Sequence, residues 1–408
     1  MSKKVIAVLA TLDTKGQEAA FLREQLAELG SGAWIVDLGV IGEPAITGDV
    51  SRREVAKAGG KELAELLRAP KRESAAPVMV KGATALLRDA VAAGRVHGVI
   101  GLGGLQGTAA CTEVMRALPY GLPKVMVSTV ASGDTSPYVD IKDITMMFSV
   151  GDILGLNPFT RKILANAAGA AHGMAQVVVE LHTETRERPL IGMTNLGVLT
   201  AGAMKAIELF EARGYDVIVF HAVGSGGRAM EQMMKEGIIG AVFDYGLGEI
   251  TDELFGGLRA AGPERLTVAG KLGIPQVICP GGAEHVGVLV DPPHSVPDRW
   301  KDHTYVFHNP VVFVPRLRAD EIVAVAEDIT QRLQHTKGKA VFMIPRGGTG
   351  SYAKAGGPLR DEESDAAFFA ALKERLPAAI EVVERDADAE DPAFVGECVE
   401  RLLAMLET

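Results

Sequence analysis

Apolar runs of strand length alternate with helix-like segments along most of the chain, and this alternation constrains the fold more than any other feature. Val96–Leu102, for example, runs into a glycine-rich loop, and Gln106–Ala117 follows with helical periodicity. Strands that alternate with helices form parallel sheets, because a helix supplies the crossover that each return connection needs. The sequence therefore predicts the α/β class, with two Rossmann-like domains whose mainly parallel sheets are flanked by helices.

The length of the chain, 408 residues, exceeds what one hydrophobic core usually serves. An alanine-rich helical stretch, Asn157–Leu181, gives way to the charged run His182–Pro189, where the proline stops the helix. We place the domain boundary there, which predicts an N-terminal nucleotide-binding domain over 1–185. The C-terminal domain, 186–408, is expected to hold a second ligand. A GxGG pattern follows a strand in each half, at Gly101–Gly104 and Gly224–Gly227, and leaves an internal duplication open.

Composition excludes several classes of protein. The net charge is −10 and the lysines and arginines are scattered, so no basic stripe for nucleic acid is expected. The chain has no apolar run of about 20 residues, so we expect no membrane partner. The apolar run Val5–Ala10 is too short for a signal peptide and reads as a first strand. Cys111, Cys279 and Cys398 are far apart, which favours reduced thiols and a cytoplasmic location.

Three loops of the first half follow predicted strands and contain small or hydroxyl residues: Thr11–Gly16, Gly101–Thr108 and Ser128–Asp134. Glycines let the backbone approach a ligand, and a helix N-terminus offers free N–H groups to an anion. The second loop has Gln106 where the dinucleotide fingerprint needs glycine, and no Walker A pattern occurs. Tight turns and helix caps are the alternative reading. The candidate nucleotide-binding residues are Asp13, Thr14, Lys15, Gly16, Gly103, Gly104, Gly107, Thr108, Ser128, Thr129, Ser132 and Gly133.

In the second half, His221 ends a predicted strand just before a glycine loop, and four acids crowd the segment 244–253. A histidine at a strand end can act as an acid or base, or can simply be hydrogen-bonded. Acids at a helix start can be catalytic or can stabilise the helix dipole. The histidines between 285 and 335 follow no zinc-ligand spacing. The candidate catalytic residues are His221, Asp244, Glu249 and Glu253, with Asp252 beside them.

Taken together, these motifs resemble a known family. The segment Pro119–Met174, with the loops at 11–16, 101–108 and 219–231, is similar to the Tm-one-like ATP-binding family, bacterial relatives of the ATP-binding half of the tomato mosaic virus resistance protein. The resemblance implies a two-domain α/β protein that binds ATP and magnesium in its N-terminal domain and forms a homodimer. It makes the three N-terminal loops the nucleotide contacts and assigns no metal ligand. The second domain departs from the family at Tyr245–Glu249, Gly282–Val288 and Lys354.

Three functions remain open at this stage. The leading one is an ATP-binding enzyme that acts on a small metabolite in a cleft between the domains. The second is a non-catalytic, nucleotide-dependent binding or regulatory protein. The third is a lyase or hydrolase that uses the second-domain histidine and carboxylates without turnover of ATP.

Overall fold

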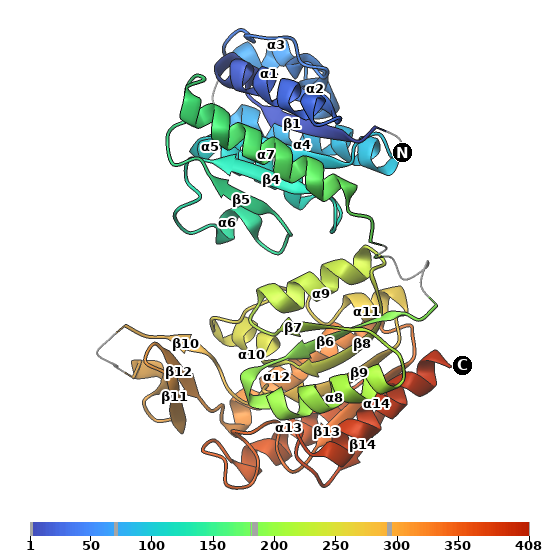
Figure 1. Cartoon of the computed structure of the whole chain (residues 1–408). Helices are drawn as coiled ribbons and strands as arrows, with labels where there is room; N and C mark the ends of the chain where they lie inside the picture. The colour runs from blue at the N-terminus through green and yellow to red at the C-terminus, as the bar shows by residue number, and fades with distance from the viewer. Residues whose placement is uncertain (1–2, 69–71, 180, 182–186, 292–295, 408) are drawn as a thin grey trace. The chain divides into compact units, whose positions relative to one another are not determined.

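The computed structural model describes residues 3–68, 72–179, 181, 187–291 and 296–407. The chain divides into two compact units, Met1–Glu180 and Leu181–Thr408, each with its own sheet and core (Figure 1). The predicted boundary at residue 186 falls in 182–186, outside the described residues. Each unit is therefore considered by itself.

The N-terminal unit is built on a parallel sheet with the strand order β2-β1-β3-β4-β5. The interiors of its strands are apolar, as expected for strands that helices cover on both faces, and polar residues such as Asp37 and Lys124 stand at strand ends. This confirms the α/β class that the sequence predicts. The strands are β1 (Val5–Ala10), β2 (Gly32–Asp37), β3 (Gly98–Gly103), β4 (Lys124–Ser128) and β5 (Thr145–Phe148).

Alternate residues of each strand enter two separate cores. Ile6 and Val8 of β1 pack with α1 and α7, whereas Ala7 and Leu9 pack with the helices of the other face, α2 to α5. The helices that follow β1 and β3 thus lie on opposite faces of the sheet (Figure 1). The helices are α1 (Leu12–Glu28), α2 (Arg52–Ala58), α3 (Leu63–Arg68), α4 (Arg72–Ala92), α5 (Leu105–Arg116), α6 (Ser136–Val139) and α7 (Pro158–Gln176).

The sequence predicts a single helix over Arg53–Leu67, and this is wrong. The segment is broken into α2 and α3 at Gly59 and Gly60, and Gly60 has a φ of +95°. A Cβ at Gly59 would collide with the carbonyl of Val78 in α4. The two glycines therefore end α2 where it packs closely on α4.

The C-terminal unit has a parallel sheet with the order β14-β13-β9-β8-β6-β7. Counted from its own first strand, the order is 2-1-3-4-5-6, which repeats the order of the N-terminal unit and adds one strand. The two GxGG segments are nevertheless not equivalent, because Gly101–Gly104 follows a third strand and Gly224–Gly227 a second one. The strands are β6 (Leu190–Asn195), β7 (Val217–His221), β8 (Ile239–Gly246), β9 (Gln276–Gly281), β13 (Ala340–Pro345) and β14 (Glu381–Arg385).

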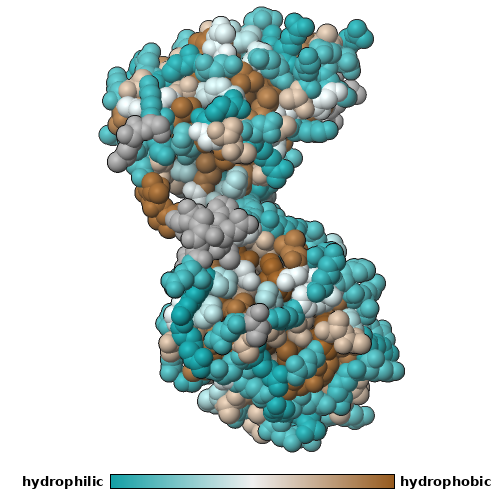
Figure 2. All heavy atoms as spheres, turned by 90° about the vertical axis from the view of Figure 1, so that its right-hand side faces the viewer, coloured by the Kyte–Doolittle hydropathy of each residue, from teal (hydrophilic) through white to brown (hydrophobic). Residues whose placement is uncertain are grey.

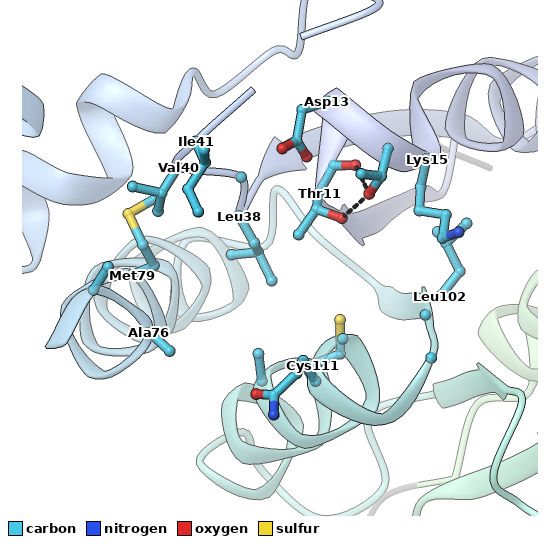
Figure 3. A pocket seen from close by; sticks show the side chains of 18 of the residues that line it. Thr11, Asp13, Lys15, Leu38, Val40, Ile41, Ala76, Met79, Leu102 and Cys111 are labelled. Atoms are coloured by element: carbon cyan, nitrogen blue, oxygen red, sulfur yellow. Dashed lines mark hydrogen bonds between the residues drawn. The ribbon is translucent and has the colours of Figure 1, made fainter. Parts of the chain in front are cut away.

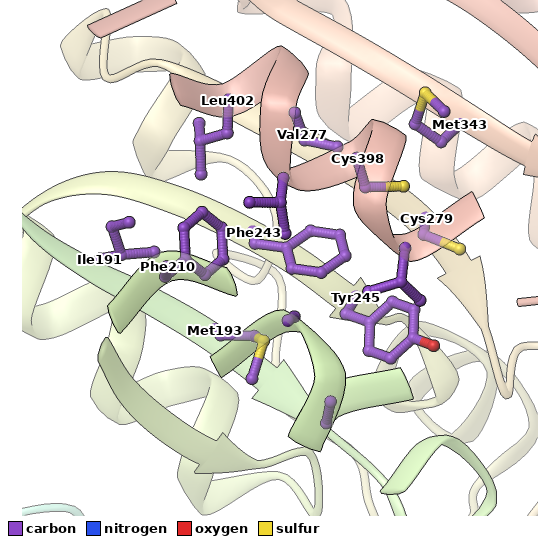
Figure 4. Close-up of a cluster of buried hydrophobic side chains, with 14 of the residues drawn as sticks. Ile191, Met193, Phe210, Phe243, Tyr245, Val277, Cys279, Met343, Cys398 and Leu402 are labelled. Atoms are coloured by element: carbon purple, nitrogen blue, oxygen red, sulfur yellow. The ribbon is translucent and has the colours of Figure 1, made fainter. Parts of the chain in front are cut away.

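Helices cover both faces of this sheet as well. One core contains Phe243 and Tyr245 of β8, packed against Phe210 of α8 and Cys398 of α14 (Figure 4). The opposite face packs against α9 to α13. The helices are α8 (Thr200–Ala212), α9 (Ser225–Lys235), α10 (Gly248–Phe255), α11 (Val268–Leu272), α12 (Ala319–Arg332), α13 (Glu362–Arg375) and α14 (Pro392–Leu406), with short 3₁₀ turns η2 (Gly197–Leu199), η3 (Asp298–Trp300) and η4 (Leu333–His335).

A small antiparallel sheet is inserted between β9 and α12, with the order β10-β12-β11. The sequence predicts only its middle strand, because β10 is two residues long and β11 is largely exposed. Phe313 of β12 is the buried residue that joins this sheet to the core of the unit. The strands are β10 (Val288–Leu289), β11 (Tyr305–Asn309) and β12 (Val312–Pro315).

Hydrophilic side chains cover most of the face of each unit that Figure 2 presents, and hydrophobic ones gather in small groups. Within the described ranges, every helix is too short or too polar to pass through a bilayer. The three cysteines are buried and unpaired.

Candidate functional site

A cavity of about 610 Å³ lies at the carboxyl edge of the N-terminal sheet (Figure 3). Its walls come from the loops after β1, β2 and β3, with one side of α4. In a sheet of order 2-1-3-4-5, the chain turns to opposite faces after the first and third strands, and ligands bind in the crevice that opens there. The cavity therefore occupies the place where topology alone predicts a binding site.

The glycine loop after β3 forms one end of the cavity. Gly103 must be glycine, because a Cβ there would lie 2.7 Å from the Cα of Gly107. Gly104 is the N-cap of α5, and the first bond of the helix joins the Thr108 N–H to the Gly104 carbonyl at 2.7 Å. The N–H groups of 105–107 precede that bond and have no intrahelical partner. They give this end of the cavity the positive pole of a helix, which favours an anion.

Lys15 and Thr14 line the cavity from the start of α1. Lys15 lies at a kink, with φ of −125° and ψ of 19°, and its ammonium donates to the carbonyl of Ile153. Among the described residues it forms no ion pair with a carboxylate. The hydroxyl oxygens of Thr14 and Thr11 lie 2.7 Å apart and share a hydrogen bond. The ammonium of Lys15 thus lies at the cavity with one hydrogen bond to the backbone.

The opposite end of the cavity is apolar. Val40 and Ile41, from the loop after β2, face Met79 of α4 across a narrow space (Figure 3). Arg52 fixes this loop, because its guanidinium donates to the carbonyls of Val40 and Gly42. Such a wall suits a flat apolar group such as a nucleobase. Leu38, Ala75, Ala76 and Val80 complete it.

Two carboxylates lie between these ends. Asp37, the last residue of β2, is 2% exposed, and its Oδ1 accepts from the N–H groups of Leu12 and Gly39 at 3.1 and 2.8 Å. Burial raises its pKa, as does the nearby charge of Asp13, against the lowering effect of these bonds. Asp13 accepts from the Gly42 N–H at 3.1 Å through Oδ2, whereas its Oδ1 is buried and has no donor.

Carboxylates of the C-terminal unit surround one buried arginine. Arg265 donates to Asp244 and, at 2.7 Å, to Glu249, and Glu231 lies 3.4 Å away. All four side chains are at most 4% exposed. Burial raises the pKa of Glu249 and raises that of Glu231 to about 7. Although burial lowers the pKa of Arg265, the acids around it hold it well above its ordinary value.

The two halves of the chain match the two domain models of one family. Residues 4–180 match the N-terminal domain, and residues 188–406 the C-terminal domain, of the uncharacterised protein family UPF0261. The chain belongs to the UPF0261 family.

Relatives in this family are similar over the whole chain. A UPF0261 protein of Clostridium tetani is 39% identical over 409 residues, which is 100% of both chains. One from Brucella melitensis is 34% identical over 96% of this chain and 93% of its own. The tomato (Solanum lycopersicum) ToMV resistance protein Tm-1(GCR237) is 33% identical over 270 residues, which are 65% of this chain and 36% of the tomato protein. The resemblance seen in the sequence is thus to a distant homologue of part of this chain.

Six of the twelve residues predicted to bind a nucleotide line the cavity of this UPF0261 chain. They are Asp13, Thr14, Lys15, Gly103, Gly104 and Gly107.

The other six lie outside the cavity lining. Gly16 lets α1 pack against Ala45, and the buried hydroxyls of Thr108 and Ser128 bond to each other at 2.7 Å. The Thr129 hydroxyl lies 3.6 Å from where a Cβ of Gly104 would be, while Ser132 and Gly133 are exposed beyond it.

The residues predicted to be catalytic lie in different surroundings. Asp244 and Glu249 are held by Arg265, and Asp252 forms a bidentate pair with Arg259 at 2.8 Å. Glu253 is exposed and accepts from the Gly262 N–H at 2.9 Å. His221 is exposed at the end of β7, and its imidazole has no hydrogen-bond partner among the described residues.

The second glycine loop already holds an anion of the protein itself. The N–H groups of Gly224 and Gly227, at the start of α9, donate to Oε1 of Glu249 at 2.6 and 3.1 Å. A Cβ at Gly227 would collide with the same carboxylate. These glycines therefore serve an internal bond, whereas the donors of the Gly103–Gly107 loop remain open to a ligand.

Sequence reasoning missed the apolar wall, although Gly39 and Gly42 frame half-buried Val40 and exposed Ile41. It also missed a polar group at the carboxyl edge of the second sheet. There, His308 of β11 and Tyr352 lie 2.9 Å apart from Nδ1 to the hydroxyl oxygen, and His308 approaches Gly197 after β6. His308 belongs to the histidines that follow no ligand pattern, so only the fold brings it to this edge.

Proposed function

We propose that the N-terminal unit binds a nucleotide, and specifically ATP, in the cavity at the carboxyl ends of β1 and β3. One observation carries this proposal: a crevice at the switch point of the sheet has free helix N–H groups at one end and an apolar wall at the other. Phosphates would lie against Gly103–Gly107, and the base between Val40, Ile41 and Met79. The ATP-binding resemblance of the sequence supports the same assignment.

Magnesium would enter this cavity on the phosphates of the nucleotide. Among the described residues, no group of three or more histidine, cysteine or acidic side chains is arranged to hold a metal ion. Mg²⁺ keeps several waters and is commonly bound through substrate phosphates with one or two carboxylates. Magnesium that is held mainly by phosphate oxygens and water needs no cage of protein ligands. We therefore propose the magnesium complex of ATP as the ligand.

Isothermal titration of the full chain with magnesium-ATP, ADP, AMP and adenosine tests this assignment. Affinity should fall stepwise as phosphates are removed, because the helix N-terminus and Lys15 act on them. Adenosine should keep measurable binding through the apolar wall. Absence of binding by every compound in the series would refute the proposal. Stronger binding of adenosine than of ATP would show that the glycine loop does not contact the phosphates.

The side chains that line the cavity are better suited to binding a nucleotide than to hydrolysing it. A nucleotide-dependent regulatory protein is therefore a second candidate function, beside an enzyme that acts on a metabolite. The cavity lining contains no histidine, and burial raises the pKa of Cys111 to about 12, so its thiol stays protonated. Lys15 shares its ammonium with a carbonyl. An enzyme would therefore need catalytic groups from outside this lining. Steady release of ADP in the presence of a metabolite panel would favour the enzyme, and binding without release the regulator.

A further inference from the structure

Asp37 occupies the position from which nucleotide-binding folds commonly recognise a sugar. In the dinucleotide folds an acid about 20 residues beyond the glycine turn, near the end of the second strand, accepts from a ribose hydroxyl. Here the acid at the end of β2 is turned inward, where its Oδ1 accepts from the N–H groups of Leu12 and Gly39. Oδ1 of Asp37 is thus committed to fixing the two loops, and Asp37 is not among the residues that line the cavity.

Asp13 lies beside it, on the first loop. A Cβ placed on Gly39 would be 3.0 Å from Oδ1 of Asp37 and 3.1 Å from Oδ1 of Asp13. Both carboxylate oxygens therefore lie beside Gly39. Asp13 lines the cavity and lies between the apolar wall and Lys15 in Figure 3. It therefore stands between the proposed places of the base and the phosphates.

Oδ1 of Asp13 is a buried carboxylate oxygen that has no hydrogen-bond donor among the described residues. Its partner oxygen accepts from the Gly42 N–H, which fixes the carboxylate in place. Buried polar atoms are almost always hydrogen-bonded, and one left without a partner carries a desolvation cost. We therefore expect Oδ1 of Asp13 to accept a hydrogen bond from a ligand bound in the cavity.

We propose that Asp13 accepts a hydrogen bond from a ribose hydroxyl and makes the cavity selective for ribonucleotides over deoxynucleotides. The proposal rests on the nucleotide binding proposed above. A carboxylate repels a phosphate, so the ligand group at Oδ1 is a donor and not an anion. A hydroxyl also suits it better than a metal ion held by the protein, because the described residues offer no group of three or more metal ligands there.

Titration of the unmodified chain with ATP, 2′-deoxy-ATP and 3′-deoxy-ATP provides the first test, since it needs no variant. A charge-assisted bond to the sugar predicts that at least one deoxy analogue binds about tenfold more weakly. Equal affinities for all three would overturn the role of Asp13 and leave the proposed nucleotide site standing. Failure of all three to bind would refute the nucleotide site itself.

The Asp13→Asn variant provides the second test. It should lower the affinity for ATP to that of the weaker deoxy analogue and leave the analogue's own affinity unchanged, as expected when one pairwise bond is removed. Asp89→Asn, an equal charge change on an exposed part of α4, is the control and should alter neither affinity. A loss that is the same for all nucleotides, and that vanishes when EDTA removes magnesium, would assign Asp13 to the cation and overturn the proposal.

Discussion

Nη2 of Arg265 lies 2.6 Å from Oδ1 of Asp244, and both side chains are buried in the C-terminal unit. The same guanidinium also binds Glu249 of α10 and approaches Glu231 of α9. One cation thus joins β8 to the two helices. Two of the acids around Arg265, Asp244 and Glu249, are catalytic candidates from the sequence. Their hydrogen bonds to Arg265 favour a structural role for both.

Removal of this cation should strongly destabilise the C-terminal unit. Arg265→Ala leaves three carboxylates buried without their partner, and breaking a buried ion pair in this way costs about 3–5 kcal/mol. Arg213→Ala is the control, because its pair with Glu400 is half-exposed and should contribute at most about 1 kcal/mol. Urea unfolding of both variants measures the difference. A similar decrease in the free energy of unfolding of the two variants would show that the buried cluster stabilises the unit no more than the exposed pair does.

Glu231 should make the stability of this unit depend on pH. Burial, together with the charge of Asp244, raises its pKa to about 7 from the ordinary value of 4.5, against the opposing effect of Arg265. The folded chain therefore binds more protons than the unfolded chain between these values, so the contribution of Glu231 to stability falls as pH rises through this window. Above about pH 7 its contribution is constant.

Glu231→Gln removes the titrating group, so the variant should lose this part of the slope. The free energy of unfolding of both proteins, followed from pH 4.5 to pH 8, measures it. Parallel curves for the two proteins would assign the slope to other groups.

The sequence predicts where the site lies in the fold better than it predicts which side chains line it. The loop Gly101–Thr108 follows a regular strand, so its place at the end of β3 could be predicted from local pattern. The wall formed by Val40 and Ile41 could not, because it depends on α4 packing beside a loop about 35 residues away in the chain. The same holds for Arg265, since no local pattern indicates that 231, 244, 249 and 265 meet. Glycine patterns also mislead when a side chain of the protein fills the loop, as Glu249 does at Gly224–Gly227.

A side chain at Gly104 should block the nucleotide without disturbing the fold. The nearest atom to a Cβ there is the Thr129 hydroxyl oxygen at 3.6 Å, an ordinary van der Waals distance, and φ is −80°. Gly104→Val should therefore weaken ATP binding at least tenfold while the melting temperature stays within about 2 °C. Gly151→Val, at a glycine surrounded by open space, should change neither quantity. Calorimetric titration with thermal melting measures both, and unchanged ATP affinity in Gly104→Val would exclude this loop from the site.

Gly202 should tolerate no side chain, because the Tyr245 hydroxyl occupies the space beside it. Tyr245 is fully buried and donates to the carbonyl of Ala389 (Figure 4 shows its packing). Gly202→Ala in α8 should cost about 1–3 kcal/mol through overpacking, although alanine is the better helix former.

Gly173→Ala is the matched control, because this α7 glycine is exposed with open space around it and should gain about 0.5–1 kcal/mol. Adding Tyr245→Phe to Gly202→Ala should cost less than the two single changes together. Additive losses would contradict a clash with the hydroxyl.

The full chain should be a homodimer that magnesium-ATP stabilises. The dimer is expected from the resemblance seen in the sequence, and the stabilisation from mass action. A ligand at about 100 times its dissociation constant adds roughly 2.7 kcal/mol, which corresponds to several degrees in melting temperature. Light scattering gives the mass of the particle and differential scanning fluorimetry the shift. A monomer whose melting is the same with and without magnesium-ATP would contradict both expectations.

The two ends of the cavity are supplied by different loops, the polar end by 103–107 and the apolar end by 38–42 together with α4. If the proposed nucleotide site is correct, changes to Val40 or Ile41 should alter which base fits while the anchor for the phosphates stays intact. For an engineer, the same separation makes 38–42 the natural segment to randomise when a different nucleotide is wanted.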